Sequence, residues 1–143
     1  YLHINNRREW FDNSIKFLKK EQIIFLDPDN GFKENFNGKL SLKYTLKEEC
    51  YKLLKNKKVV IFTQFQSFNK HHKKYLCEIF KTLSKHKLRP TFPIIRNRTA
   101  PNTFYITLKP KNCLLNLEKL YESYKQKNKN IELIKSTDFI SKN

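Results

Sequence analysis

A short apolar run ends abruptly in a cluster of polar residues near the start of the chain. The run is 23–26 (IIFL), and 27–31 (DPDNG) follows it directly. Carboxylate and amide side chains can accept hydrogen bonds from a substrate or act as acid, base or nucleophile. We therefore predict a site here, with four candidate catalytic residues: Asp27, Pro28, Asp29 and Asn30.

The place of this cluster depends on the strand before it. The run is short, rich in β-branched and aromatic residues and bounded by turn residues, which is typical of a buried strand over 22–27. An unbroken apolar run fits a parallel strand covered on both faces, and open α/β sheets bind ligands at the carboxyl ends of such strands. The alternative is a simple tight turn, because Asp, Pro, Asn and Gly also favour turns.

Further polar residues are expected at the same edge. A second apolar run, 59–63 (VVIFT), predicts a neighbouring strand, and an amide follows at its carboxyl end. Between the two runs, the polar segment 33–44 has no clear period and is long enough to be a functional loop. We expect the end of this loop and the amide to converge with the two carboxylates. The predicted substrate-binding residues are therefore Lys43, Tyr44 and Gln64.

The chain is strongly basic. Its 30 basic and 13 acidic side chains give a formal net charge of +17, which favours a polyanionic partner such as RNA or DNA. The bias is largest over 65–99, where we expect nucleic-acid contacts at Lys70, Lys73, Lys74, Arg96 and Arg98. The alternative is compositional bias without function: most basic residues are lysine, and an AT-biased genome also enriches Asn, Ile, Phe and Tyr.

The length of 143 residues is enough for one domain with a hydrophobic core. Three widely spaced cysteines form no metal or disulfide pattern, so we expect no metal and a reducing, cytoplasmic setting. No apolar run reaches the roughly 18 residues of a membrane span, and no membrane partner is expected. The chain begins with Tyr1 and contains no methionine, so we expect it to be the C-terminal part of a longer protein. These features define no oligomeric state.

The apolar patterns predict alternating strands and helices. Four strands are expected, at 22–27, 58–63, 91–96 and 103–108. The alternation favours an α/β fold with a mostly parallel sheet, helices on both faces, and a C-terminal antiparallel hairpin made by the last two of these strands. Pro93 indicates an edge strand, because proline cannot donate to a strand ladder. The short run 131–134 is a further candidate for an edge strand.

Local signals position the predicted helices. Two capping boxes, Asn6 with Glu9 and Thr45 with Glu48, should open the first and second helices. We expect Asn112 to cap the last helix. The apolar face of the third helix is expected to comprise Phe68, Tyr75, Leu76, Ile79, Phe80 and Leu83.

The element order and the DPDNG motif resemble the C-terminal half of a class I S-adenosylmethionine-dependent methyltransferase fold. There, the fourth strand ends in an acidic motif and the sheet closes with a reversed hairpin. The resemblance implies that 22–27 is the fourth strand, 58–63 the fifth, and 91–96 with 103–108 the hairpin, with 91–96 at the edge. The segments IIFLDPDNGF, KY, VVIFTQ and TFYITLKP are similar to those of uncharacterised bacterial proteins with a DPDNG motif.

In the methyltransferases of this fold that modify amino groups of nucleic-acid bases, the motif is Asp/Asn-Pro-Pro-aromatic. The resemblance implies that Asp27 and the Pro28 carbonyl accept hydrogen bonds from the amine of a flipped base. In this chain Asp29 replaces the second proline and Asn30 replaces the aromatic residue, with Phe32 two positions later.

The cofactor that this resemblance implies is S-adenosylmethionine. A glycine-rich loop after a strand normally grips it, but Gly31 and Gly38 are the only glycines in the sequence. A missing N-terminal half would have to supply that loop. We expect the chain as it stands to transfer no methyl group.

Other interpretations of the carboxylates remain open. A strand that ends in Asp-x-Asp also resembles the first motif of Mg²⁺-dependent haloacid-dehalogenase-type phosphatases, with Asp27 as nucleophile, Asp29 as acid/base and Thr63 in the second motif. No later strand ends in paired acids to hold magnesium. A PD-(D/E)xK nuclease would need a Glu-x-Lys on a following strand, which is absent. A non-catalytic, basic nucleic-acid-binding module would use DPDNG only as a turn.

Overall fold

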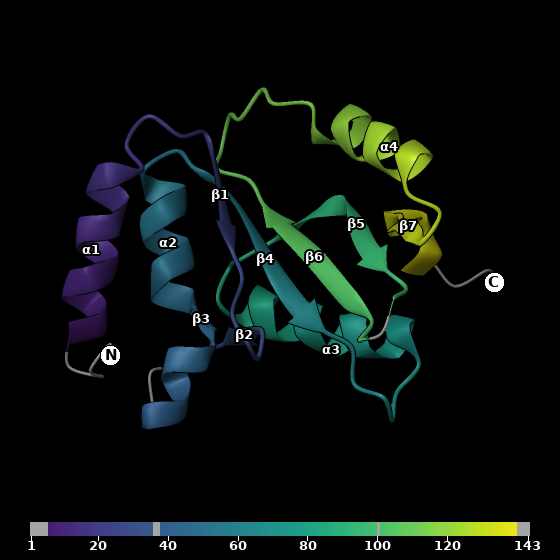
Figure 1. Cartoon of the computed structure of the whole chain (residues 1–143), viewed down its shortest axis with the longest axis horizontal. Helices are drawn as coiled ribbons and strands as arrows, with labels where there is room; N and C mark the ends of the chain where they lie inside the picture. Colours follow the sequence, from purple (N-terminus) through teal and green to yellow (C-terminus); the bar gives the residue numbers. More distant parts are fainter. Residues whose placement is uncertain (1–5, 36–37, 100, 140–143) are drawn as a thin grey trace.

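The computed structural model of the chain describes residues 6–35, 38–99 and 101–139. Its α-helices are α1 (Arg7–Phe17), α2 (Lys47–Lys55), α3 (His72–Lys85) and α4 (Leu117–Lys127), and its 3-10 helices include η2 (Lys39–Lys43) and η3 (Ser136–Phe139). Its strands are β1 (Ile23–Leu26), β2 (Phe32–Lys33), β3 (Thr45–Leu46), β4 (Val59–Phe65), β5 (Pro90–Asn97), β6 (Thr103–Leu108) and β7 (Ile131–Ile134). Figure 1 shows their arrangement.

Five strands form one mixed sheet in the order β1-β4-β6-β5-β7. The β1–β4 pair is parallel, whereas β4–β6, β6–β5 and β5–β7 are antiparallel. The α/β class and the β5/β6 hairpin are confirmed, but the expectation of a mostly parallel sheet is wrong. The reason is that β6 inserts between β4 and β5, and β7 adds a second reversed strand. A separate parallel pair, β2–β3, lies beside the main sheet.

Pro93 does not mark an edge strand, because β5 has β6 on one side and β7 on the other. The pairing of β5 with β6 shifts register between Thr91 and Ile95, and β7 pairs only with the part of β5 from Ile94 onward. The proline therefore occupies an irregular stretch where its missing N–H costs no ladder bond. The predicted edge strand at 131–134 is confirmed as β7.

Helices cover the two faces of the sheet unequally. α1, α2 and α3 pack their apolar side chains on one face, around a core that includes Val60, Phe62 and Leu76. α4 packs alone on the other face, against Val59 and Ile95. We call these the α3 face and the α4 face. Phe25 of β1 is on the α4 face beyond the reach of α4 and is 52% exposed, so the predicted burial of β1 on both faces is wrong.

The helix boundaries correct several local expectations. Asn6 precedes α1, but its side chain forms no capping hydrogen bond. In α2 it is Glu49, not Glu48, that accepts the N–H of Leu46 at the helix start. In α4 the cap is Asn116, not Asn112. Phe68 is not part of the apolar face of α3, because it lies before that helix and is 84% exposed. Within the described residues, no helix is long and apolar enough to cross a membrane.

Candidate functional site

β1, β4 and β5 run in the same direction, so their carboxyl ends lie along one edge of the sheet. This edge gathers most of the residues singled out in the sequence. The turn 27–31 follows β1, Gln64 lies near the end of β4, and Arg96 lies near the end of β5. We call this line of residues the carboxyl edge.

Asp27 is joined to β4 by a hydrogen bond at the carboxyl edge. The Thr63 hydroxyl donates to Asp27 Oδ1 at 3.0 Å and also lies 3.5 Å from the carbonyl oxygen of Pro28. Thr63 is buried and Asp27 is exposed. The hydroxyl therefore orients the carboxylate beside the Pro28 carbonyl, while Oδ2 of Asp27 has no hydrogen-bond partner among the described residues. The arrangement suits a ligand that donates N–H groups.

Gln64 points to the opposite face of the sheet from Thr63, because successive side chains of a strand alternate. Its Oε1 accepts the backbone N–H of Phe32 at 2.9 Å, and its Nε2 donates to the Tyr75 hydroxyl at 2.7 Å. Burial raises the pKa of that hydroxyl, and the hydrogen bond from Gln64 opposes the rise. Gln64 is thus buried beneath the turn and does not converge with Asp27 and Asp29, contrary to the sequence expectation.

Gly31 lets the turn lie directly on Gln64. Its φ is +84°, and a Cβ atom there would be 2.4 Å from Gln64 Oε1. A side chain would therefore collide with the amide that fixes Phe32. The close approach that this glycine permits is to the protein itself, not to a ligand.

The backbone of the segment 43–45 lies against the turn. The backbone N–H of Asn30 donates to the Lys43 carbonyl at 2.9 Å, and that of Thr45 donates to the Gly31 carbonyl at 2.8 Å. Lys43 Nζ is 3.7 Å from Asp29 Oδ2. Both side chains are more than half exposed, so the pair is weak and is open to displacement by a ligand.

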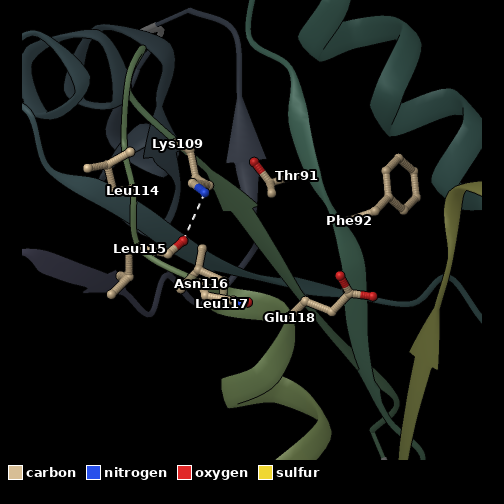
Figure 2. A pocket seen from close by; sticks show the side chains of 8 residues that line it. All are labelled: Thr91, Phe92, Lys109, Leu114, Leu115, Asn116, Leu117 and Glu118. Carbon is tan, nitrogen blue, oxygen red and sulfur yellow. Dashed lines mark hydrogen bonds between the residues drawn. The ribbon is translucent and has the colours of Figure 1, made fainter.

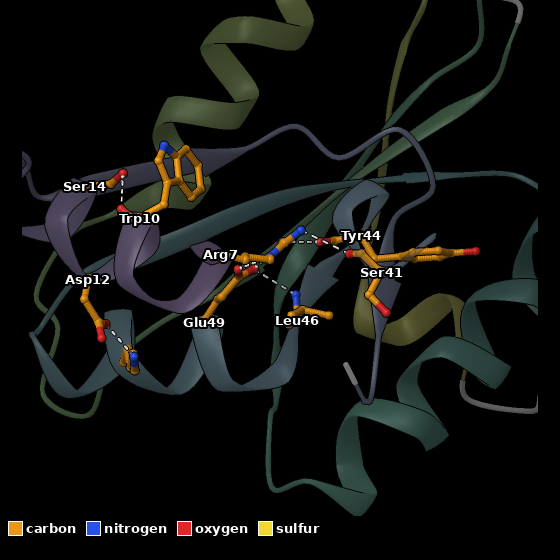
Figure 3. Close-up of polar contacts among 9 residues, drawn as sticks. Arg7, Trp10, Asp12, Ser14, Ser41, Tyr44, Leu46 and Glu49 are labelled. Carbon is orange, nitrogen blue, oxygen red and sulfur yellow. Dashed lines mark hydrogen bonds and ion pairs between the residues drawn. The ribbon is translucent and has the colours of Figure 1, made fainter. Parts of the chain in front are cut away.

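A buried ion pair holds the segment that carries Lys43. Arg7 Nε donates to Glu49 Oε1 at 2.7 Å, and its two terminal nitrogens donate to the carbonyls of Ser41 and Tyr44 and to Glu49 Oε2. Both side chains of the pair are about nine-tenths buried. Figure 3 shows Arg7 between Glu49 and the 41–44 segment. Arg7 therefore ties α1 to α2 and fixes the segment on both sides of Lys43.

Two aromatic side chains lie beside Asp27 on the α4 face. The ring centroids of Phe25 and Tyr105 are 6.0 Å apart, and the rings are tilted by 36°. Tyr105 is directly opposite Thr63 in the β4–β6 pair, and Phe25 is beside Ile61 in the β1–β4 pair. The carboxylate and the aromatic pair thus share one face of three adjacent strands.

The predicted nucleic-acid contacts lie at the carboxyl edge and at the start of α3, but several of their charges have partners. Lys70 pairs with Glu78 at 2.6 Å, and Arg96 pairs with Glu132 at 2.9 Å. Arg98 Nη2 donates to a backbone carbonyl of residue 129 at 2.9 Å. In the described part of the chain, three of the predicted side chains form no ion pair: Lys73, Lys74 and Arg98.

A pocket of about 330 Å³ lies at the opposite end of the sheet. Thr91, Phe92, Lys109 and the segment 114–118 line it (Figure 2). Lys109 Nζ donates to the Leu115 carbonyl at 2.9 Å, so its charge is already engaged. None of the predicted site residues lines this pocket, and it is separate from the DPDNG site.

Neither a metal nor the implied cofactor fits the residues described. No group of three or more His, Cys, Asp or Glu side chains in the described ranges could hold a metal ion. For S-adenosylmethionine, Gly31 is packed on Gln64, and Gly38 lies alone in a loop with no atom within 4 Å of its would-be Cβ. Neither glycine belongs to a strand–loop–helix cradle, so the described residues do not form the loop that would grip the cofactor.

Comparisons of the chain with protein-family models, with curated proteins and with solved structures found no match.

The sequence did not reveal three features of this site: the hydroxyl of Thr63, the Arg7–Glu49 pair and the exposed ring of Phe25. Strand alternation could have placed Thr63 on the face of Asp27, given the pairing of β1 with β4. The ion pair joins residues 42 positions apart and has no local signal.

Proposed function

We propose that this chain is a methyltransferase-like α/β domain that binds nucleic acid, with Asp27 and the Pro28 carbonyl accepting hydrogen bonds from the amino group of one base. The base must be unpaired to present its amino group to an exposed side chain, so the proposed partner is single-stranded RNA or DNA. The proposal places this binding in a reducing, cytoplasmic setting, in keeping with the free thiols of Cys50, Cys77 and Cys113.

The observation that carries the proposal is the hydrogen bond from Thr63 to Asp27 at the carboxyl edge. It holds a carboxylate and a neighbouring carbonyl together with no described lysine or arginine within hydrogen-bond reach of Asp27. Two fixed acceptors recognise a donor, and an amino group offers two N–H bonds to them.

The strand order gives further support. The resemblance implied a hairpin whose first strand lies outside its second, and β5 does lie outside β6 relative to β4. β7 is an addition to that pattern. The proposal concerns recognition of the amine only, because the described residues form no glycine-rich loop for a methyl donor.

The basic character supports a polyanion rather than a small amine as the partner. The net charge of +17 raises the local concentration of nucleic acid, and Lys73 and Lys74 lie near the carboxyl edge with no ion-pair partner in the described ranges. A Mg²⁺-dependent phosphatase or nuclease is less well supported, because Asp29 is next to Lys43 rather than next to further acids.

The test is a salt titration of binding to a fluorescent single-stranded octamer of mixed sequence, with wild type and Asp27→Ala. The proposal expects the same slope of log K against log salt for both proteins, because the phosphate contacts are unchanged, and a lower affinity for Asp27→Ala at every salt concentration. Unchanged or tighter binding by Asp27→Ala would contradict the proposed role of Asp27. It would favour the alternative of a non-catalytic basic surface in which DPDNG is only a turn.

A further inference from the structure

Resting on this proposed function, we infer that Phe25 and Tyr105 form the platform on which the recognised base stacks, and that the site selects bases with an exocyclic amino group over uracil and thymine. The base would lie on the α4 face of the sheet, with its amino group directed to Asp27. No residue of the DPDNG motif itself supplies this platform.

The positions of the residues are set by the strand register. Asp27 follows Phe25 by two residues, which places their side chains on the same face about 7 Å apart. Thr63, which holds Asp27, is directly opposite Tyr105. The two rings are 6.0 Å apart and belong to neighbouring rows of the same face. A base lying on these rings therefore reaches the carboxylate with a group at its edge.

The face is open at this end and closed at the other. α4 and the segment before it pack at the amino end of β1 and β4, in a cluster that Ile23, Ile61 and Tyr105 also contact. Phe25 lies outside this cluster and is 52% exposed, and its ring centroid is 6.0 Å from that of Tyr105. An exposed ring beside a fixed carboxylate provides both parts of base recognition, the stacking surface and the polar contact.

The preference for amino-bearing bases follows from the charge of the site. Asp27 and the Pro28 carbonyl only accept hydrogen bonds. Adenine, cytosine and guanine present an exocyclic NH₂ group, whereas the one N–H on the pairing edge of uracil or thymine lies between two carbonyl oxygens. Those oxygens would face the carboxylate and repel it.

The experiment compares wild type with Phe25→Leu, which keeps an apolar side chain but removes the ring. Phe17→Leu is the matched control, because Phe17 is also an exposed phenylalanine, 90% accessible, but lies on α1. Affinities are measured for octamers of adenosine, cytidine and uridine, and stacking is followed by the fluorescence of a central 2-aminopurine, which is quenched when it stacks on an aromatic ring.

We expect wild type to bind the adenosine and cytidine octamers more tightly than the uridine octamer. Phe25→Leu should bind the adenosine and cytidine octamers at least about fivefold more weakly than wild type, which is the lower end of the contribution of base–aromatic stacking. It should also lose the quenching of 2-aminopurine. Phe17→Leu should change neither the affinity nor the quenching. Binding that depends on Asp27 but shows equal affinity and quenching in Phe25→Leu would overturn this inference and leave the proposed function in place. No binding of any octamer by wild type would overturn both.

Discussion

Thr63 donates a 3.0 Å hydrogen bond to Asp27 across the parallel β1–β4 pair. The bond joins the end of an edge strand to a central strand and orients the carboxylate at the carboxyl edge. Phe25 and Tyr105 flank it on the same face. The position of the candidate site therefore depends on the pairing of two strands that are separated by the whole of α2 in the sequence.

Replacing Thr63 by valine should weaken both the fold and binding. Valine keeps the shape and the β propensity but removes the donor, so the free energy of unfolding should fall by about 1 kcal/mol. Octamer affinity should fall several-fold, because Asp27 is no longer oriented. Thr63→Ser retains the hydroxyl and serves as the control in urea unfolding and binding assays. If valine and serine variants bind equally well, the orienting role of Thr63 is wrong.

Glu49→Gln should be strongly destabilising, because it leaves the Arg7 guanidinium as a buried charge without its partner. The expected loss in the free energy of unfolding is about 3–5 kcal/mol. The comparison is Asp12→Asn, which breaks the half-exposed pair with Lys52 and should cost no more than about 1 kcal/mol. Chemical denaturation measures both. Equal losses would mean that the Arg7–Glu49 pair is not buried in solution.

Gly31→Ala should destabilise the protein more than Gly38→Ala. Both glycines have a positive φ, +84° and +68°, and Gly38, with a ψ of 177°, lies in a region that essentially only glycine adopts. Each alanine therefore brings backbone strain of about 1–3 kcal/mol. Only at Gly31 does the new Cβ also meet Gln64, which cannot move without breaking its bonds to Phe32 and Tyr75. We expect an additional loss of about 1–3 kcal/mol there, measured by thermal and urea unfolding. A smaller effect at residue 31 than at residue 38 would contradict the packing of the turn on Gln64.

His72 should make the protein less stable at mildly acidic pH. Burial, followed by the charges of Arg96 and His71, lowers the pKa of His72, against the opposing effect of Glu132. The unfolded chain therefore binds a proton more readily than the folded one, and stability is lost as the pH falls below the ordinary histidine value of about 6.5. Urea unfolding at pH 7.5 and pH 5.0 should show a larger loss for wild type than for His72→Gln. Identical pH dependence in both proteins would show that His72 is not a source of the effect.

Local patterns predicted the strands well. The expected strand at 103–108 has the bounds of β6, the short run at 131–134 is β7, and the run 23–26 is β1. These segments are short apolar runs bounded by polar or turn residues, so the information lies within the segment itself. Helix starts were less accurate, because several Asn, Thr and Glu residues stand close together and only the folded backbone selects which of them caps.

Properties set by distant pairing were not predictable from this one sequence. The insertion of β6 between β4 and β5 made most strand pairs antiparallel, and α4 covered only part of its face, which left Phe25 exposed. Gln64 and Thr63 are adjacent in β4, so their side chains lie on opposite faces of the sheet. The buried amide is on one face, and the hydroxyl that donates to Asp27 is on the other. The sequence predicted the turn, but it did not predict the face of the sheet on which Asp27 lies.

The most direct test is the ratio of dissociation constants of Asp27→Ala and Asp29→Ala for one adenosine octamer at one salt concentration. Both variants remove one negative charge from the same turn, so their effects on phosphate attraction are matched. Asp29 is exposed beside Lys43, whereas Asp27 is held by Thr63. We expect Asp27→Ala to bind at least about threefold more weakly than Asp29→Ala, an amount within the net contribution of one hydrogen bond. A ratio at or below one would contradict it.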